Sequence, residues 1–135
     1  MRLRARLLLA AGIAMLAAVR PVAAHHSFAA ECDANLPVTV SGVVTKVEWT
    51  NPHARVYVEA TDGAGTVVTW DFEMAGPNGL MRLGWTRNSL PPGTRVTVTG
   101  YRAKRAPHLA NASSITLSDG RKMFAGSSFE GDQAR

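Results

Sequence analysis

The chain has 135 residues, of which 15 are lysine or arginine and 10 are aspartate or glutamate, so its formal net charge is +5. This length suits one domain with a modest core, and a single cysteine excludes a disulfide within the chain. Most of the positive excess lies between Met1 and Arg20, so the remainder lacks the basic surface of a nucleic-acid-binding protein. We therefore expect no nucleic-acid partner.

The segment from Met1 to Ala24 is typical of a secretory signal peptide, with arginines at positions 2, 4 and 6 before an apolar run. That run, Leu7–Val19, is too short to span a bilayer. The small residues that end the segment suit cleavage after Ala24. Cleavage there removes four arginines and no acidic residue, so the mature chain is close to neutral. We expect a periplasmic or secreted protein with no membrane span after processing.

Cleavage after Ala24 would place His25 at the mature N-terminus, next to His26. The free amine and the two imidazoles are nitrogen donors that Cu(II) and Ni(II) favour. Cleavage one residue earlier would place His26 at position three, and such a terminus binds Cu(II) through its amine, two deprotonated amides and an imidazole. Copper is therefore the cofactor that the sequence suggests, whereas a closed zinc site would need four convergent ligands. The alternative is a solvated arm whose histidines bind nothing.

An extended arm is predicted over residues 25–36, followed by the first strand. This valine-rich strand runs from Pro37 to Trp49, and Gly42 lies where its alternation changes phase, which indicates a bulge or bend. The dipeptide Asn51-Pro52 ends the strand. The single cysteine, Cys32, lies in the arm, where we expect a small and partly buried side chain.

Two further strands are predicted at Arg55–Ala60 and Thr66–Met74, with a turn over residues 61–65 between them. On the second of these strands, four apolar residues share one face: Val68, Trp70, Phe72 and Met74. We expect this face to belong to the core. Asp71 and Glu73 share the other face, where a carboxylate pair is conceivable, although such alternation favours the wet face of a strand.

A short helix is predicted after Gly76, with Pro77 near its first position and Gly84 at its end. Its apolar side would comprise Leu80, Met81 and Leu83. Residues 85–90 are expected to add a further helical turn before the break at residues 91–93.

Two more strands are predicted at Thr94–Arg102 and Ala112–Leu117, with a loop over residues 103–111 between them. An Asp119-Gly120 turn leads into a last short strand at residues 121–124. The polar segment from residue 126 to residue 135 is expected to be a flexible tail.

The order strand, strand, strand, helix, strand, strand, with a bent first strand, indicates one mainly β domain over residues 37–125. We predict a small OB-like, five- to six-stranded Greek-key barrel with one short helix between strands 3 and 4. Another small barrel or sandwich of similar strand count is the alternative.

An OB-like barrel usually binds its ligand between the loop joining strands 1 and 2 and the loop joining strands 4 and 5. Two of the four histidines, His53 and His108, fall on these loops. The sequence therefore predicts metal ligation by His25, His26, His53 and His108. It also predicts contacts to an organic ligand by Trp49, Asn51, Trp85, Lys104 and Arg105. In the alternative interpretations, His53 is a turn residue bonded to nearby backbone and His108 belongs to an ordinary loop.

Recognisable motifs lie along nearly the whole mature chain. They are HHSF at residues 25–28, VTKVEWTNPH at 44–53, GWTR at 84–87, PGTRVTVTGYRAK at 92–104, DGRK at 119–122 and FAGSS at 124–128. Together they resemble the secreted bacterial family called domain of unknown function 6152. The resemblance implies export and a small β-rich domain with no established activity, and it draws attention to the histidines of the first two motifs. The chain departs from the family's pattern at Cys32 and near Arg55, where aromatic residues are usual.

No Ser-His-Asp arrangement, phosphate-binding loop or Cys-His pair is visible in the sequence, so nothing in it indicates an enzyme. The favoured function is an exported binding module for Cu(II) or a similar ion, held by the mature N-terminal histidines. The alternatives are carbohydrate or peptide binding at the barrel face, and a non-catalytic module that binds a protein of the envelope.

Overall fold

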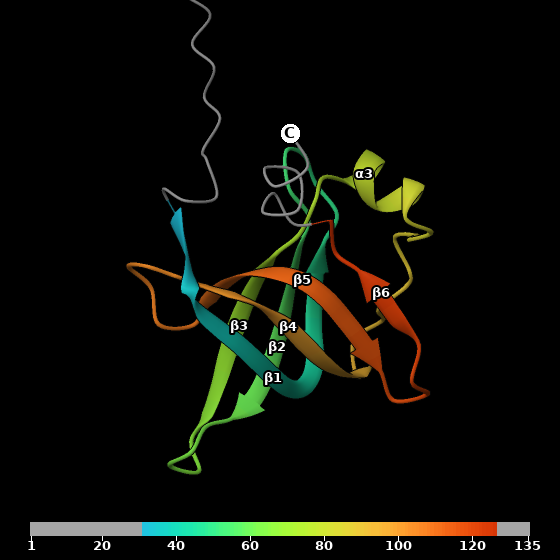
Figure 1. Ribbon diagram of the computed structural model, residues 1–135. Coiled ribbons are helices and arrows are strands. Elements are labelled where there is room, and N and C mark those ends of the chain that lie inside the picture. The colour runs from blue at the N-terminus through green and yellow to red at the C-terminus, as the bar shows by residue number, and fades with distance from the viewer. Residues whose placement is uncertain (1–30, 127–135) are drawn as a thin grey trace, which may run out of the picture.

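The computed structural model describes residues 31–126, which form a small β-rich domain (Figure 1). Its strands are β1 (Cys32–Glu48), β2 (Arg55–Thr61), β3 (Val67–Glu73), β4 (Arg95–Ala103), β5 (Leu109–Leu117) and β6 (Lys122–Phe124). Helix α3 (Pro77–Arg82) lies between β3 and β4, as predicted. The predicted signal segment, His25, His26 and residues 127–135 lie outside the described residues. Within residues 31–126, no helix is long and apolar enough to cross a membrane.

The six strands belong to one sheet that closes on itself as a barrel. Their order is β3-β2-β1-β4-β5-β6, and each neighbouring pair is antiparallel. Strand β3 also pairs in parallel with β5, with Asp71 opposite Leu109 and Glu73 opposite Asn111, so that the first five strands form a ring. This strand order and the place of the helix are those of an OB-like Greek-key barrel, which confirms the predicted fold.

Strand β1 is long enough to pair with both of its neighbours. Residues 32–43 pair with β4, and residues 43–48 pair with β2. Near the change from one neighbour to the other, a Cβ on Gly42 would lie 2.1 Å from the carbonyl oxygen of Glu59. A glycine is needed there because the two backbones approach so closely. The sequence placed a bend or bulge at this glycine, and the register irregularity itself falls slightly later, between Val44 and Lys46.

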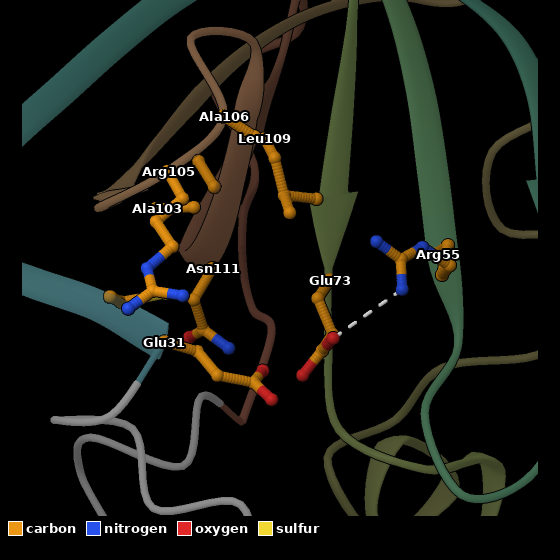
Figure 2. Close-up of a pocket in the computed structure, with 10 residues that line it drawn as sticks. Glu31, Arg55, Glu73, Ala103, Arg105, Ala106, Leu109 and Asn111 are labelled. Carbon is orange, nitrogen blue, oxygen red and sulfur yellow. Dashed lines mark hydrogen bonds and ion pairs between the residues drawn. The ribbon is translucent and has the colours of Figure 1, made fainter.

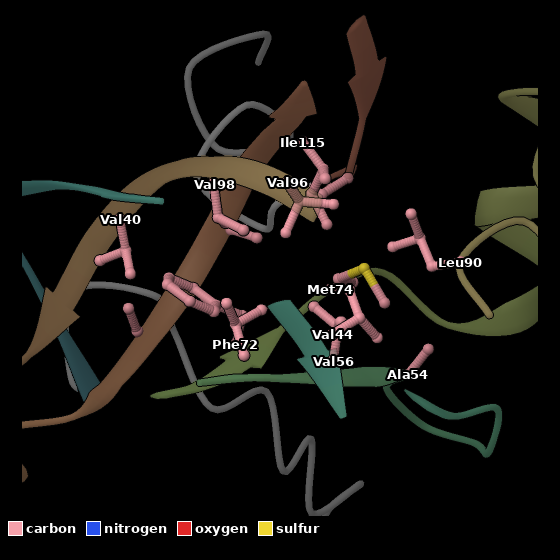
Figure 3. Packing of buried hydrophobic residues seen from close by; sticks show 14 of the residues in the cluster. Val40, Val44, Ala54, Val56, Phe72, Met74, Leu90, Val96, Val98 and Ile115 are labelled. Carbon is pink, nitrogen blue, oxygen red and sulfur yellow. The ribbon is translucent and has the colours of Figure 1, made fainter. Parts of the chain in front are cut away.

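Alternate residues of the strands fill the barrel interior (Figure 3). The largest fully buried side chains are Val44, Val56, Val58, Phe72, Met74, Leu80, Val98 and Ile115. Each side chain of this kind contributes about 1.5–3 kcal/mol of hydrophobic stabilisation. The inward face of β3 is the apolar face that the sequence predicted, with Trp70 partly buried against the core.

Two strands begin earlier than the sequence indicated. Strand β1 begins at Cys32 instead of Pro37, because Cys32 pairs with Ala103 at the end of β4. Strand β5 begins at Leu109 instead of Ala112, because its first residues pair with β3. Both extensions depend on partners that are distant in the sequence, so the local alternation of residue types does not reveal them. Part of the predicted arm and part of the predicted loop are therefore strand.

The helical region also differs from the prediction. Among the residues expected to form its apolar side, Leu80 is buried, whereas the other two are exposed, Met81 by 53% and Leu83 by 49%. Residues 85–90 form turns instead of a helical turn. The hydroxyl of Ser89 accepts a hydrogen bond from the backbone N–H of Thr86 at 2.9 Å, and such local side-chain bonds compete with helix.

Candidate functional site

A pocket of about 550 Å³ lies at the seam where β3 and β5 pair (Figure 2). One wall comes from the start of β1, the end of β4 and the β4–β5 loop (residues 104–108), and the opposite wall comes from β2 and β3. The charged residues that line it are Glu31, Arg55, Glu73 and Arg105. Small or apolar side chains, including Cys32 and Leu109, supply much of the remaining surface. A volume of this size is usual for a small-molecule site.

The most unusual group in this pocket is the side chain of Asn111 on β5. Asn111 is 3% exposed, and its amide oxygen Oδ1 is buried without a hydrogen-bond partner among the described residues. A buried acceptor left without a donor costs about 1–3 kcal/mol. The backbone of Asn111 is held on both sides, since it pairs with Tyr101 of β4 and Glu73 of β3. The backbone that carries this oxygen is therefore fixed at the seam between β3 and β5.

Arg55 fixes the opposite wall of the pocket. Its Nε and Nη2 donate to the two carboxylate oxygens of Asp71 at 2.8 and 2.9 Å, and its Nη1 donates to Glu73 at 3.4 Å. Hydrogen bonding to Asp71 is the main reason that the pKa of Arg55 is raised. Asp71 and Glu73 thus lie on the outward face of β3, which the alternation in the sequence favoured. The guanidinium of Arg55 bridges their carboxylates, so the two do not form an acid–base pair.

His53 lies in the β1–β2 loop (residues 49–54), which follows the cis peptide bond between Asn51 and Pro52. Its Nδ1 lies 3.1 Å from the carbonyl oxygen of Met74 and 3.7 Å from a carboxylate oxygen of Glu73. A carbonyl oxygen can only accept, so Nδ1 carries the proton and donates it to Met74. In the neutral ring, Nε2 is then the nitrogen with a free lone pair, and the side chain is 41% exposed. The bond to backbone is the one that the turn interpretation expected, and it leaves Nε2 able to bind a metal.

His108, the second predicted loop ligand, has different neighbours. Its ring meets Trp70 edge-on, with the ring centroids 5.2 Å apart. Trp70 and Glu73 are three residues apart on β3, about 10 Å at the usual strand rise, and their side chains point to opposite faces. The structure therefore does not bring His53 and His108 together. Within residues 31–126, no group of three or more histidine, cysteine, aspartate or glutamate side chains could hold a metal ion.

The residues predicted to contact an organic ligand do not gather in one place. Arg105 lines the seam pocket, whereas Asn51 and Lys104 are exposed on the two loops. Trp49 is partly buried against the core. The prediction for Trp85 is wrong: it is 3% exposed, and its Nε1 donates to the carbonyl oxygen of Phe124 at 2.8 Å. An indole whose polar nitrogen finds a partner inside the protein is a core residue, not a stacking platform.

Cys32 lines the same pocket as a small buried side chain, which agrees with the interpretation of the sequence. Burial raises the pKa of its thiol, and the negative charge of Glu73 raises it further. The thiol therefore stays protonated at neutral pH, which makes it a poor nucleophile and a poor metal ligand.

The predicted ligand contacts did not include Asn111, Glu31 or Arg55, which line the pocket. Asn111 lies in a run of small or apolar residues from Leu109 to Ala112, and a polar side chain inside a buried strand would have drawn attention. The local pattern instead predicts that Asn111 ends the loop over residues 103–111. Glu31 carries no local signal, because only the pairing of β1 with β4 brings it beside the pocket.

A model of the family described as "Family of unknown function (DUF6152)" matches residues 13–110. The chain belongs to this family. The matched range includes the HHSF and NPH motifs, strands β1 to β4 and the start of β5, so the family resemblance seen in the motifs is confirmed. No curated protein and no solved structure matches the chain.

Proposed function

We propose that the protein is an exported binding module that holds Cu(II), or a similar ion, between its mature N-terminus and His53. The observation that carries this proposal is the hydrogen bond from Nδ1 of His53 to the carbonyl oxygen of Met74 at 3.1 Å. Metal-bound histidines usually donate their second ring N–H to a carbonyl or carboxylate group, which fixes the tautomer and the ring orientation. His53 has this arrangement, and its Nε2 remains available.

The N-terminal histidines are close enough along the chain to complete such a site. Glu31 and Glu73 line the same pocket from opposite walls, and Glu73 lies 3.7 Å from Nδ1 of His53. The segment 25–30 precedes Glu31 in the mature chain and spans at most about 20 Å when extended. The amine and ring of His25 could therefore reach Nε2 of His53, with His26 as a further donor.

The donors in this proposal suit Cu(II) better than zinc. An amine and imidazoles provide nitrogen ligands for a tetragonal Cu(II) or Ni(II) site. The thiol of Cys32 is kept protonated by burial and the nearby charge of Glu73, so it does not offer the thiolate that a closed zinc site would use. His108 is not part of this site, because its ring lies beside Trp70, whereas His53 lies beside Glu73.

The test is a Cu(II) titration of the natively processed protein, with its N-terminus confirmed by mass spectrometry. Replacing His53 with alanine should weaken Cu(II) binding by at least about tenfold, in line with the effect of disturbing a metal site. An extra N-terminal residue should weaken it as well. His108→Ala is the matched control, and we expect it to bind as the wild type does. Equal affinity in His53→Ala and wild type would reduce the site to a chelating tail and contradict the proposal.

A further inference from the structure

We infer that the seam pocket is a binding site for a small organic cation that donates N–H hydrogen bonds, such as a primary amine or a guanidinium compound. This inference is independent of the copper proposal, because it depends on the described pocket residues alone. Its starting point is the buried Oδ1 of Asn111, which has no donor among the described residues.

Three acceptor groups line the pocket: the amide oxygen of Asn111 and the carboxylates of Glu31 and Glu73. In the view of Figure 2, the carboxylate of Glu31 lies between the amide of Asn111 and the carboxylate of Glu73. The guanidinium of Arg55 is committed mainly to Asp71, since its two bonds there are 2.8 and 2.9 Å, against 3.4 Å to Glu73. A ligand that meets these oxygens must bring hydrogen-bond donors, and the carboxylates favour a positive charge on it.

The size and lining of the pocket favour an organic molecule over a bare ion. A volume of about 550 Å³ is within the range of small-molecule sites. Leu109 and Ala106 offer carbon surface on the wall formed by β5 and the β4–β5 loop. No group of three or more metal-ligating side chains exists among the residues that the structure describes, so these carboxylates do not make a metal centre by themselves.

Arg105 indicates that the expected ligand could also carry a negatively charged group. It lies on the wall opposite Glu73 and is the one charged pocket residue contributed by the β4–β5 loop. A ligand with an amine at one end could place a carboxylate near this guanidinium, as an amino acid or a short peptide does. L-arginine therefore joins simple amines among the probes.

The test is calorimetric titration of the full processed protein with putrescine, agmatine and L-arginine, in the presence of a metal chelator. Tetramethylammonium is the control ligand, because it carries a positive charge without any hydrogen-bond donor. We expect saturable binding of at least one of the three probes, and at least tenfold weaker binding of tetramethylammonium. No binding of any probe, or equal binding of tetramethylammonium, would overturn the inference.

The matched variants are Asn111→Leu in the pocket and Asn88→Leu on an exposed turn. Asn111→Leu removes the unsatisfied oxygen with little change of volume, so the protein should remain folded, with a melting temperature equal to or above that of the wild type. Binding of the preferred probe should fall at least tenfold in Asn111→Leu and stay unchanged in Asn88→Leu. Unchanged affinity in a folded Asn111→Leu protein would mean that water satisfies this oxygen, and would also overturn the inference.

Discussion

The β1–β2 loop and the β4–β5 loop each carry one histidine, and the two side chains have different contacts. His53 donates from Nδ1 to the carbonyl oxygen of Met74 and keeps its other nitrogen available. His108 packs its ring edge-on against Trp70. The two residues are alike in type and both lie on loops of the barrel, but their neighbours differ. A hydrogen bond from the second ring nitrogen orients a metal-bound histidine, and His53 makes such a bond to Met74.

The largest expected effect on stability concerns Trp70, whose ring contacts that of His108. Trp70 stacks on Phe72 with ring centroids 5.6 Å apart and packs against the core. Trp70→Ala should lower the free energy of unfolding by about 3 kcal/mol, measured by urea denaturation, because it removes a large, partly buried ring. Cu(II) affinity should not change, since His53 has other neighbours. A loss of affinity as large as that of His53→Ala would show that the two loops are coupled.

A smaller effect is expected from Gly76, which supports the loop of His53. A Cβ at this position would lie 2.5 Å from the carbonyl oxygen of Pro52, so the backbone would have to move. Gly76→Ala should cost about 1–3 kcal/mol in the free energy of unfolding and should weaken Cu(II) binding by displacing the loop.

The matched control for Gly76→Ala is Gly79→Ala, inside α3. A Cβ at Gly79 would meet only the Cβ of Ala75, at 3.3 Å, and the side chain of Arg82, at 4.0 Å. Alanine is favoured over glycine in a helix by about 0.5–1 kcal/mol, so this variant should be neutral or stabilising, with unchanged Cu(II) affinity. Equal losses of stability in the two variants would contradict the argument from close approach.

The smallest expected effect concerns Cys32 and Glu73. Burial, and then the charge of Glu73, raise the pKa of this thiol above its ordinary value of 9.0. The protonated thiol thus contributes stability that is fully present below that ordinary pKa and is lost as the pH rises through the higher pKa of the folded state. Glu73→Gln should lower the pKa and speed alkylation of the native thiol by iodoacetamide at pH 8.5 by roughly twofold. An unchanged rate in this variant would mean that burial alone controls the thiol.

Local patterns in the sequence were sufficient to predict the order of the strands and the barrel architecture. Alternation over Val68 to Met74 identified the inward face of β3, and Pro77 marked the start of α3. The order of these elements, with a bend near Gly42, led to the barrel because few topologies accommodate that order. Side-chain alternation and turn residues act over a few positions, which is why they can be read from one segment at a time.

The pocket could not be predicted in this way. The parallel pairing of β3 with β5 sets Asn111 beside Glu73, and the early start of β1 adds Glu31. The opposite case is Trp85, which the sequence predicted to contact a ligand. Its indole N–H instead donates to the carbonyl oxygen of Phe124 inside the protein.

The sequence by itself determined the family, the mainly β class and the order of the strands, because these follow from local alternation and from extended motifs. Only the tertiary structure decided which histidine donates to the carbonyl group of Met74 and which polar side chain, among the residues that the structure describes, is buried without a donor. Both properties depend on groups brought together by barrel closure: Met74 for His53, and the β3–β5 seam for Asn111. Burial and hydrogen-bond partnership are set by residues distant in the chain, so no local pattern encodes them.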